Sequence, residues 1–223
     1  MKAEDFTALI RLRLENAGVD ASAEAIAGSA AYLAILARWN QRINLTAFNL
    51  DRPSHEAIDR LIVEPLSAAR FVHADDRSVV DIGSGGGSPA LPFKLAAPRL
   101  RTVLIEARTR KSAFLREAAR TLELADVRVD TARFDEQWMT ENPEAVDVVT
   151  MRAVRTDEAL WRYLGKLVRP GGRLFWFVDL VTSPIVASTV PLSGWAFKSP
   201  GPGQDHGLAI LTRIEETPAQ RPL

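Results

Sequence analysis

The chain has 223 residues, of which 47% are hydrophobic and 25% are charged, and its 28 basic and 28 acidic residues give a net charge of zero. This composition is that of an ordinary globular protein. The absence of cysteine excludes disulfides, thiol catalysis and cysteine–metal sites. The first residues do not resemble a signal peptide, and the longest apolar run, near residues 30–37, is too short to span a membrane. We therefore expect a cytoplasmic protein without membrane association.

Residues 1–72 have the apolar spacing of helices. Phe6, Ile10 and Leu14 share one helical face, and Ile26, Leu33 and Leu36 share another. We predict an N-terminal helical region over residues 1–72 and a second domain over residues 73–223.

After Ser78 the pattern alternates between strands and helices. The predicted strands are 78–82, 101–106, 127–131, 146–151, 173–178, 194–198 and 208–214, and the predicted helices are 89–97, 110–122, 135–141 and 156–168. Thr156 is placed to cap the last helix, and Pro170-Gly171-Gly172 to end it. The two final strands have no helix between them and must pair antiparallel. The pattern predicts a Rossmann-like α/β fold whose mostly parallel seven-stranded sheet has an antiparallel last strand, as is typical of class I methyltransferases.

The most informative segment is residues 78–89, where a β-branched strand ends in Asp81 and a glycine-rich loop leads to Pro89. Glycines at a strand end allow a tight turn and a close approach to a ligand. A Walker loop is excluded because no Gly-Lys-Ser/Thr follows. A dinucleotide fingerprint fits poorly because Ser88 takes the place of its third glycine. S-adenosylmethionine has no phosphate and fits better, although a purely structural turn is the alternative.

Glu106 ends the next predicted strand, 25 residues after Asp81. A ribose-binding acid in a βαβ unit lies at a similar spacing, and a carboxylate accepts hydrogen bonds from both ribose hydroxyls. The alternative is a solvated strand end.

Basic residues are unevenly distributed despite the zero net charge. Residues 94–120 contain eight basic and two acidic residues, residues 121–151 contain two basic and eight acidic residues, and residues 152–173 contain six basic and two acidic residues. Such basic stretches are suited to a phosphate backbone, or they are solvated helix faces. The residues show no His/Asp/Glu set at metal-ligand spacing, so we expect no metal site.

The chain resembles the RsmG/GidB family, the small-subunit ribosomal RNA methyltransferase G enzymes. The matching segments are Trp39-Asn40, Asn44-Leu45-Thr46, the glycine loop through Pro92, Leu104-Ile105-Glu106, Lys111 to Leu115, Val149 to Ala153, and Pro170-Gly171-Gly172. The resemblance implies methyl transfer from S-adenosylmethionine to N7 of a guanosine in 16S ribosomal RNA, with the RNA or the 30S subunit as partner. We expect the protein to be a monomer.

The resemblance also implies site residues. The cofactor would be held by the glycine-loop segment and four later positions, namely Asp81, Gly83, Ser84, Gly85, Gly87, Ser88, Glu106, Phe134, Asp135 and Arg152. Phe134 would stack on the adenine and Asp135 would accept from its amine. Arg152 is the catalytic candidate beside cofactor and target base, with a structural salt bridge as the alternative. Trp39, Asn40, Asn44 and Thr46 would cover the site or contact RNA, or serve as core and caps.

The chain departs from the family pattern on the target side. Arg60 to Pro65 replaces the usual His-x-x-x-Asp-Ser, Ser88 replaces a larger apolar residue, and Val178 stands where a lysine is expected. Two other functions stay open: a methyltransferase for a small molecule or protein, and a cofactor-binding protein without transferase activity. A nicotinamide-dependent oxidoreductase is more distant because of Ser88-Pro89.

Overall fold

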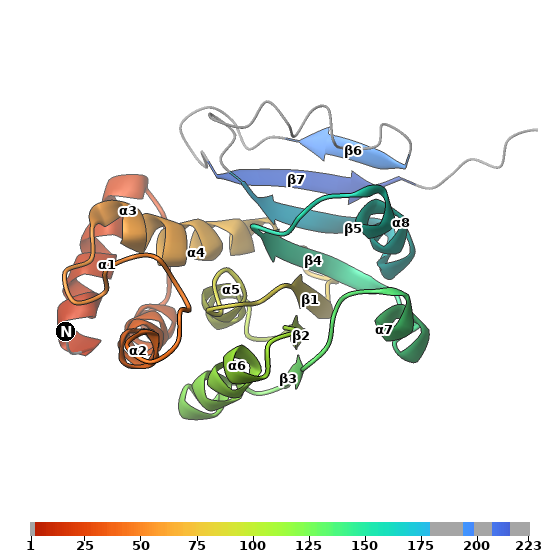
Figure 1. The fold of residues 1–223 in the computed structure, drawn as a ribbon. Coiled ribbons are helices and arrows are strands. Elements are labelled where there is room, and N and C mark those ends of the chain that lie inside the picture. The colour runs from red at the N-terminus through yellow and green to blue at the C-terminus, as the bar shows by residue number, and fades with distance from the viewer. Residues whose placement is uncertain (1–2, 179–193, 199–206, 215–223) are drawn as a thin grey trace, which may run out of the picture.

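The computed structural model describes residues 3–178, 194–198 and 207–214, so most of the loop predicted between the last two strands lies outside the described residues. Within these ranges the chain forms one seven-stranded sheet in the order β3-β2-β1-β4-β5-β7-β6 (Figure 1). Its strands are β1 Ser78–Ile82, β2 Arg101–Ile105, β3 Val127–Asp130, β4 Val146–Arg152, β5 Val168–Phe177, β6 Trp195–Lys198 and β7 Leu208–Arg213.

β1 lies at the centre of the parallel part of the sheet. It pairs in parallel with β2 and β4, placing Val80 opposite both Val103 and Val149. β7 runs antiparallel to β5 on one side and to β6 on the other. The predicted mostly parallel sheet with an antiparallel last strand is confirmed, and β6 rather than β7 forms the edge.

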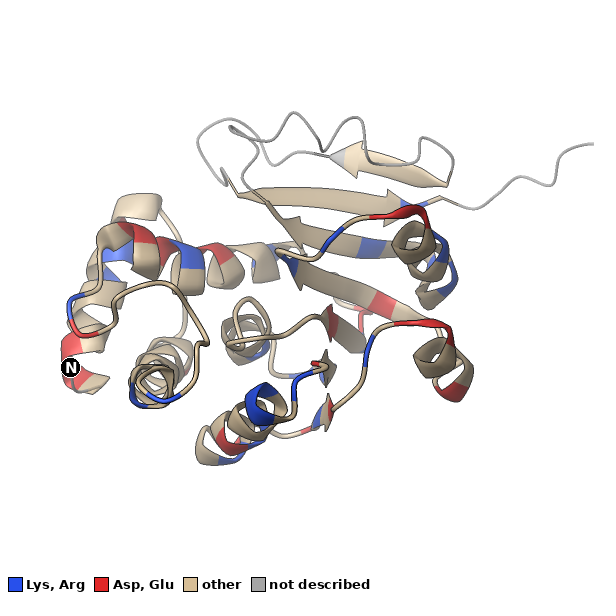
Figure 2. Cartoon of the chain, in the orientation of Figure 1, with Lys and Arg blue, Asp and Glu red and all other residues tan. Residues whose placement is uncertain are grey.

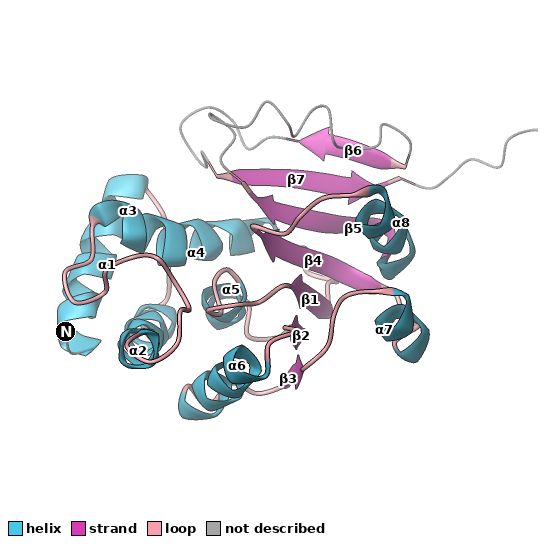
Figure 3. Ribbon diagram, viewed as in Figure 1, coloured by secondary structure: helices cyan, strands magenta, loops and turns pink. Residues whose placement is uncertain are grey.

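Helices cover both faces of the sheet (Figure 3). The second half of the chain supplies α5 Ala90–Ala96, α6 Thr109–Thr121, α7 Glu136–Glu141 and α8 Glu158–Leu167. α5 and α6 lie on one face, and α7 and α8 lie on the other. The prediction that Thr156 caps α8 is wrong, because the cap is Asp157, whose side chain accepts from the Leu160 amide. Thr156 and Asp157 are adjacent, and sequence propensities do not locate the start of a helix to within one residue.

Strand β5 begins earlier than predicted. Pro170-Gly171-Gly172 lies inside it, where the pairing changes from Val146 opposite Val168 to Val148 opposite Arg173. A Cβ at Gly172 would lie 2.8 Å from the Asp147 carbonyl oxygen, so only glycine fits there. The segment is therefore a bulge that bends a strand, not a turn before one.

The N-terminal region packs against α5 and α6. It contains α1 Ala3–Ala17, α2 Ala23–Asn40, α3 His55–Ile58, the π-helix η1 Asp59–Val63, α4 Glu64–Ala68 and the 3₁₀-helix η2 Ala69–Phe71. Phe6, Tyr32 and Leu36 belong to the same buried cluster as Leu91 and Phe114. A common core thus joins the regions on either side of the predicted boundary at residue 72. None of the described helices is long and apolar enough to cross a membrane.

The Asp147 side chain, on β4, forms hydrogen bonds that link the amino-terminal ends of β1, β4 and β5. One carboxylate oxygen accepts from Arg169 Nε at 2.6 Å, and the other accepts from the Arg77 amide and from the Ser78 amide and hydroxyl. Burial acts to raise the pKa of Asp147, but these hydrogen bonds outweigh it and hold the pKa at about 2. A pKa depressed in the folded state stabilises the fold above the pKa of the unfolded chain.

We predict that Asp147→Asn lowers the free energy of unfolding at pH 7 by about 2 kcal/mol, the value of a shift of nearly two pKa units. The contribution of the carboxylate is lost as the pH falls from about 4 to about 2, so the difference from the natural chain vanishes there. Urea denaturation across this range measures it. The control is Asp75→Asn, whose side chain is 76% exposed. Equal stability of both variants at pH 7 would contradict the prediction.

Candidate functional site

The glycine loop turns immediately after β1 and is held by backbone hydrogen bonds. The amides of Gly83 and Ser84 both donate to the Ile105 carbonyl oxygen, and the Gly87 amide donates to the Ser84 carbonyl oxygen at 2.7 Å. Gly85 has a φ of +51°, a region that side chains disfavour. A Cβ at Gly86 would lie 2.8 Å from the Leu45 carbonyl oxygen, so this glycine allows the loop to contact the N-terminal region.

Glu106 lies beneath this loop. One oxygen of its carboxylate accepts from the Gly85 amide at 2.9 Å, and the other accepts from the Arg108 amide at 2.7 Å. Each oxygen keeps a lone pair that a hydroxyl could use. A pyrophosphate on this loop would have to compete with a carboxylate for the loop amide, so the geometry disfavours a dinucleotide cofactor.

Asp81 is buried at the end of β1. Its Oδ1 accepts from the Thr150 hydroxyl at 2.5 Å, whereas its Oδ2 is buried without a hydrogen-bond partner. Burial raises the pKa of Asp81 to about 6, against the opposing effect of the Thr150 and Ser84 hydrogen bonds and of the Arg152 charge. An unpartnered carboxylate oxygen at a strand end indicates a place for a hydrogen-bond donor or a cation.

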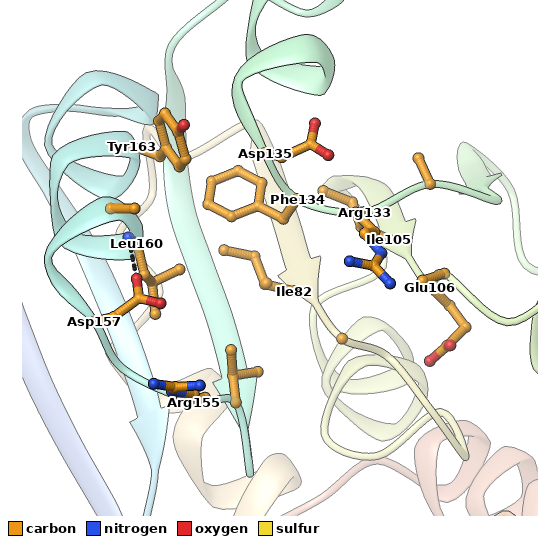
Figure 4. Close-up of a pocket in the computed structure, with 15 residues that line it drawn as sticks. Ile82, Ile105, Glu106, Arg133, Phe134, Asp135, Arg155, Asp157, Leu160 and Tyr163 are labelled. Atoms are coloured by element: carbon orange, nitrogen blue, oxygen red, sulfur yellow. Dashed lines mark hydrogen bonds between the residues drawn. The ribbon is translucent and has the colours of Figure 1, made fainter.

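The larger of two cavities around the loop has a volume of about 460 Å³ (Figure 4). Gly83, Glu106, Phe134 and Asp135 all line it, so four of the predicted cofactor residues meet there. Phe134 points into the space between Tyr163 and Ile82, and its ring lies 6.0 Å from the Tyr163 ring in an edge-to-face arrangement. The Asp135 side chain also caps α7 by accepting from the Trp138 amide at 3.1 Å.

Sequence reasoning missed several residues of this cavity. Tyr163, Leu160 and Val154 supply apolar surface, and Arg133 and Arg155 add positive charge. Tyr163 and Leu160 come from α8, and Val154 and Arg155 from the segment before it. The helical spacing of Leu160 and Leu164 predicts which face of α8 is buried, but not that the first turn borders a cavity.

Arg152 and Ser88 do not line this cavity. They line a second cavity of about 240 Å³, between the glycine loop and the N-terminal region. The Arg152 guanidinium pairs with Glu64 at 2.6 Å, donates to the Arg60 carbonyl oxygen and lies over the Phe177 ring at 4.9 Å. The salt bridge that was its structural alternative is therefore present. Ser88 donates its hydroxyl to the Leu61 carbonyl oxygen at 2.9 Å.

The remaining predicted loop residues line neither cavity. Ser84 is buried and donates to the Asp81 carbonyl oxygen at 3.3 Å, and Gly85 and Gly87 both have a positive φ in the turn of the loop. The loop therefore contributes Gly83 to the larger cavity and Gly86 and Ser88 to the smaller one. The Ala153 backbone, next to Arg152, has a φ of +53°, a strained conformation for a residue with a side chain.

Tyr32 joins the N-terminal region to the loop. Its hydroxyl donates to the Gly86 carbonyl oxygen at 2.6 Å, and its side chain is fully buried. Burial raises the pKa of Tyr32, so the hydroxyl keeps the proton that it donates. The position of α2 and the shape of the loop are thus coupled.

A group that sequence reasoning did not single out lies elsewhere, before β1. The side chains of His73, Asp75 and Asp76 offer ligand atoms within 4.8 Å of one another. Asp76 is fully buried and forms ion pairs with Arg173 and Arg169. Two guanidiniums already neutralise this carboxylate, and their charge opposes a cation there.

Comparison with known proteins gives consistent family matches. A family model described as rRNA small subunit methyltransferase G matches residues 26–178. A protein from Xanthomonas euvesicatoria with the name ribosomal RNA small subunit methyltransferase G is 32% identical over 92% of both chains. Proteins of the same name from Stenotrophomonas maltophilia and Chloroflexus aggregans are 35% and 42% identical, covering 80% and 64% of this chain and 79% and 59% of their own.

Solved structures with the same fold have little sequence identity to the chain. An O-methyltransferase family protein from Burkholderia thailandensis superposes with a TM-score of 0.53 at 16% identity, over 71% of this chain and 57% of its own. The precorrin-6y C5,15-methyltransferase from Geobacter metallireducens also gives 0.53 at 16% identity, over 77% and 91%. The predicted class I methyltransferase fold is confirmed.

We predict that Asp81→Asn stabilises the ligand-free protein at pH 7 by about 1–2 kcal/mol. A shift of two pKa units means that the ionised Asp81 carboxylate costs the folded state about 3 kcal/mol. Asparagine removes this cost, but its buried amide N–H groups have no acceptor, which reduces the gain in stability. Between pH 4 and 6 the folded state binds the Asp81 proton more tightly than the unfolded chain, so this contribution to stability falls as the pH rises. Denaturation at pH 4, 5, 6 and 7 tests this. The control is Asp51→Asn, at an exposed position. Parallel pH profiles for the natural chain and Asp81→Asn would contradict it.

Proposed function

The chain belongs to the rRNA small subunit methyltransferase G family, and from this membership we propose that it methylates N7 of a guanosine in 16S ribosomal RNA with S-adenosylmethionine as methyl donor. The family match carries the proposal. The geometry around the glycine loop supports it, because the residues there suit a cofactor that has an adenosine and a cationic amino-acid part but no phosphate.

The chemistry of the donor set fits this cofactor. Glu106 would hold the ribose hydroxyls with the lone pairs that the Gly85 and Arg108 amides leave free. Phe134 would contact the adenine ring inside the larger cavity, and Asp135 would accept from the adenine amine. Asp81 lines neither cavity, but its buried Oδ2 has no hydrogen-bond partner and would suit the positive end of the ligand.

The proposed reaction makes few demands on acid–base groups. When bound, S-adenosylmethionine supplies an electrophilic methyl group on its sulfonium. Guanine N7 offers a lone pair and carries no proton, so no general base is needed. The two histidines among the described residues, His55 and His73, are exposed and line neither cavity around the loop. The protein would act by positioning the reactants, an effect equivalent to roughly 7–11 kcal/mol at best.

Charge is segregated in a way that supports an RNA substrate. Basic residues are concentrated on α6, and acidic residues on α7 and at the start of α8 (Figure 2). Arg108, Arg110, Arg116 and Arg120 are exposed along or next to α6. Arg110 and Lys111 occupy the first turn of that helix, where the helix dipole disfavours positive charge. Such a placement is suited to phosphate binding rather than to helix stability.

We predict that Glu106→Gln weakens S-adenosylmethionine binding ten- to a hundredfold. The amide can still accept from the Gly85 amide, but it loses the charge that strengthens the hydrogen bonds from the ribose, worth about 1.5–3 kcal/mol. Isothermal calorimetry measures the affinity. Glu15→Gln changes an exposed carboxylate of α1 and is the matched control. Unchanged affinity in Glu106→Gln would remove this residue from the proposed site.

The activity itself is tested by incubating the protein with labelled S-adenosylmethionine and 30S subunits from a strain that lacks this methylation. We expect label in 16S ribosomal RNA, recovered as N7-methylguanosine. Label in RNA at another atom would overturn the N7 proposal. Cofactor binding without any label in RNA would favour a small-molecule or protein substrate instead.

A further inference from the structure

The second cavity lies where the N-terminal region meets the glycine loop. Its lining includes Leu45, Thr46 and Phe48 from the 41–54 loop, and Ser88 and Arg152 from the domain that follows. Gly86 also lines it, so the loop that borders the larger cavity forms part of this wall as well. The glycine loop therefore contributes to the lining of both cavities.

The Asn40 side chain holds the start of the wall from the 41–54 loop in shape. Asn40 Oδ1 accepts from the amides of Leu45 and Thr46 at 2.8 and 3.0 Å, and Asn40 Nδ2 donates to the Thr46 carbonyl oxygen at 3.1 Å. Neighbouring Trp39 donates to Glu117 on α6 and packs edge-to-face on Phe114. The Trp-Asn and Asn-Leu-Thr segments therefore build a pre-shaped wall rather than a flexible cover.

The charged groups that line the cavity are both guanidiniums. Arg60 and Arg152 line it, and Glu64, which does not, lies 3.7 Å from the Arg60 Nη1 and 2.6 Å from the Arg152 Nη2. Guanidiniums donate hydrogen bonds and accept none. A ligand edge that carries only acceptors fits such a lining. The major-groove edge of guanine carries the acceptors N7 and O6, whereas that of adenine adds an amino donor.

The size of the cavity limits its occupant to one base. Its volume of about 240 Å³ is below the roughly 300–1,000 Å³ of sites for drug-sized ligands. Leu45 and Phe48 provide apolar surface at this site, and a planar base released from a helix stacks on such side chains. A nucleotide that remained stacked in RNA could not enter a space of this kind.

We propose that this second cavity receives a single guanine base turned out of the RNA, with the Phe48 ring against its face and the Arg60 guanidinium donating to O6. The assignment rests on the proposed function. A base held through O6 presents the adjacent N7 without occupying its lone pair, which a bidentate contact to both acceptors would do. Arg60 and Phe48 are then the specificity-determining residues for the target base.

The test compares Phe48→Ala, Phe48→Leu and Arg60→Gln with Arg52→Ala, an exposed arginine of the same loop that lines neither cavity around the glycine loop. Steady-state methyl transfer to unmethylated 30S subunits gives kcat/KM, and calorimetry gives the affinity for S-adenosylmethionine. We expect Phe48→Ala and Arg60→Gln to lower kcat/KM for subunits ten- to a hundredfold, with cofactor affinity and thermal midpoint unchanged. Phe48→Leu keeps an apolar side chain in the wall and serves as the second variant if Phe48→Ala unfolds the loop. It should also lower kcat/KM, because leucine has no ring to stack on the base.

A second readout separates base recognition from a structural role. Subunits reconstituted with 2,6-diaminopurine in place of the target guanine exchange O6 for an amino group. The natural enzyme should discriminate against them at least tenfold, and Arg60→Gln should discriminate much less, because an amide can accept as well as donate. Equal kcat/KM for all variants, or undiminished discrimination by Arg60→Gln, overturns the assignment. Failure of the natural enzyme to methylate any RNA overturns the proposed function, and with it this inference.

Discussion

The contact between the N-terminal region and the backbone of the glycine loop is the constraint on which both cavities depend. Tyr32 donates to the Gly86 carbonyl oxygen at 2.6 Å, and the Leu45 carbonyl oxygen approaches so closely that a side chain at Gly86 would collide with it. The loop is therefore packed between β1 on one side and the helical region on the other. Because close-packed interiors transmit strain, a substitution that displaces Tyr32 or the Leu45 backbone would displace the loop as well.

Charge around the loop is arranged at a cost to stability. Asp81 carries a buried oxygen without a partner, and Arg152 has a buried Nε without one. Each group is partly compensated, by Thr150 and by Glu64 respectively. Polar groups held rigidly in a low-dielectric site need little reorganisation when a ligand binds. Enzymes commonly accept a loss of stability at their active sites for this reason. The unpartnered Asp81 oxygen, which weakens the ligand-free fold, would thus be preorganised for a cationic ligand.

Local pattern predicts the sheet, the glycine loop and Glu106, which follow from runs of β-branched residues and from strand ends that meet at one edge. Phe134 and Asp135 were expected only from the family resemblance. The structure places these two residues with Gly83 and Glu106 around one cavity. The surroundings of Arg152 are not local. They depend on Arg60 and Glu64, about 90 residues earlier, which only packing of the N-terminal region brings into contact. The Pro170–Gly172 bulge was misread because a helix-breaking triplet has the same composition as a strand bulge.

Because Asp59–Val63 is a π-helix, the number of residues in this segment determines the position of Arg60 as much as the identity of its residues does. Its hydrogen bonds span one residue more than those of an α-helix, and each residue of an α-helix turns the chain by about 100°. Loss of a single codon here would let the segment relax to an ordinary helix and rotate Arg60 relative to Glu64 and Arg152. Insertions and deletions, rather than point substitutions, are then the changes by which related chains would most readily acquire or abandon this arrangement of arginines.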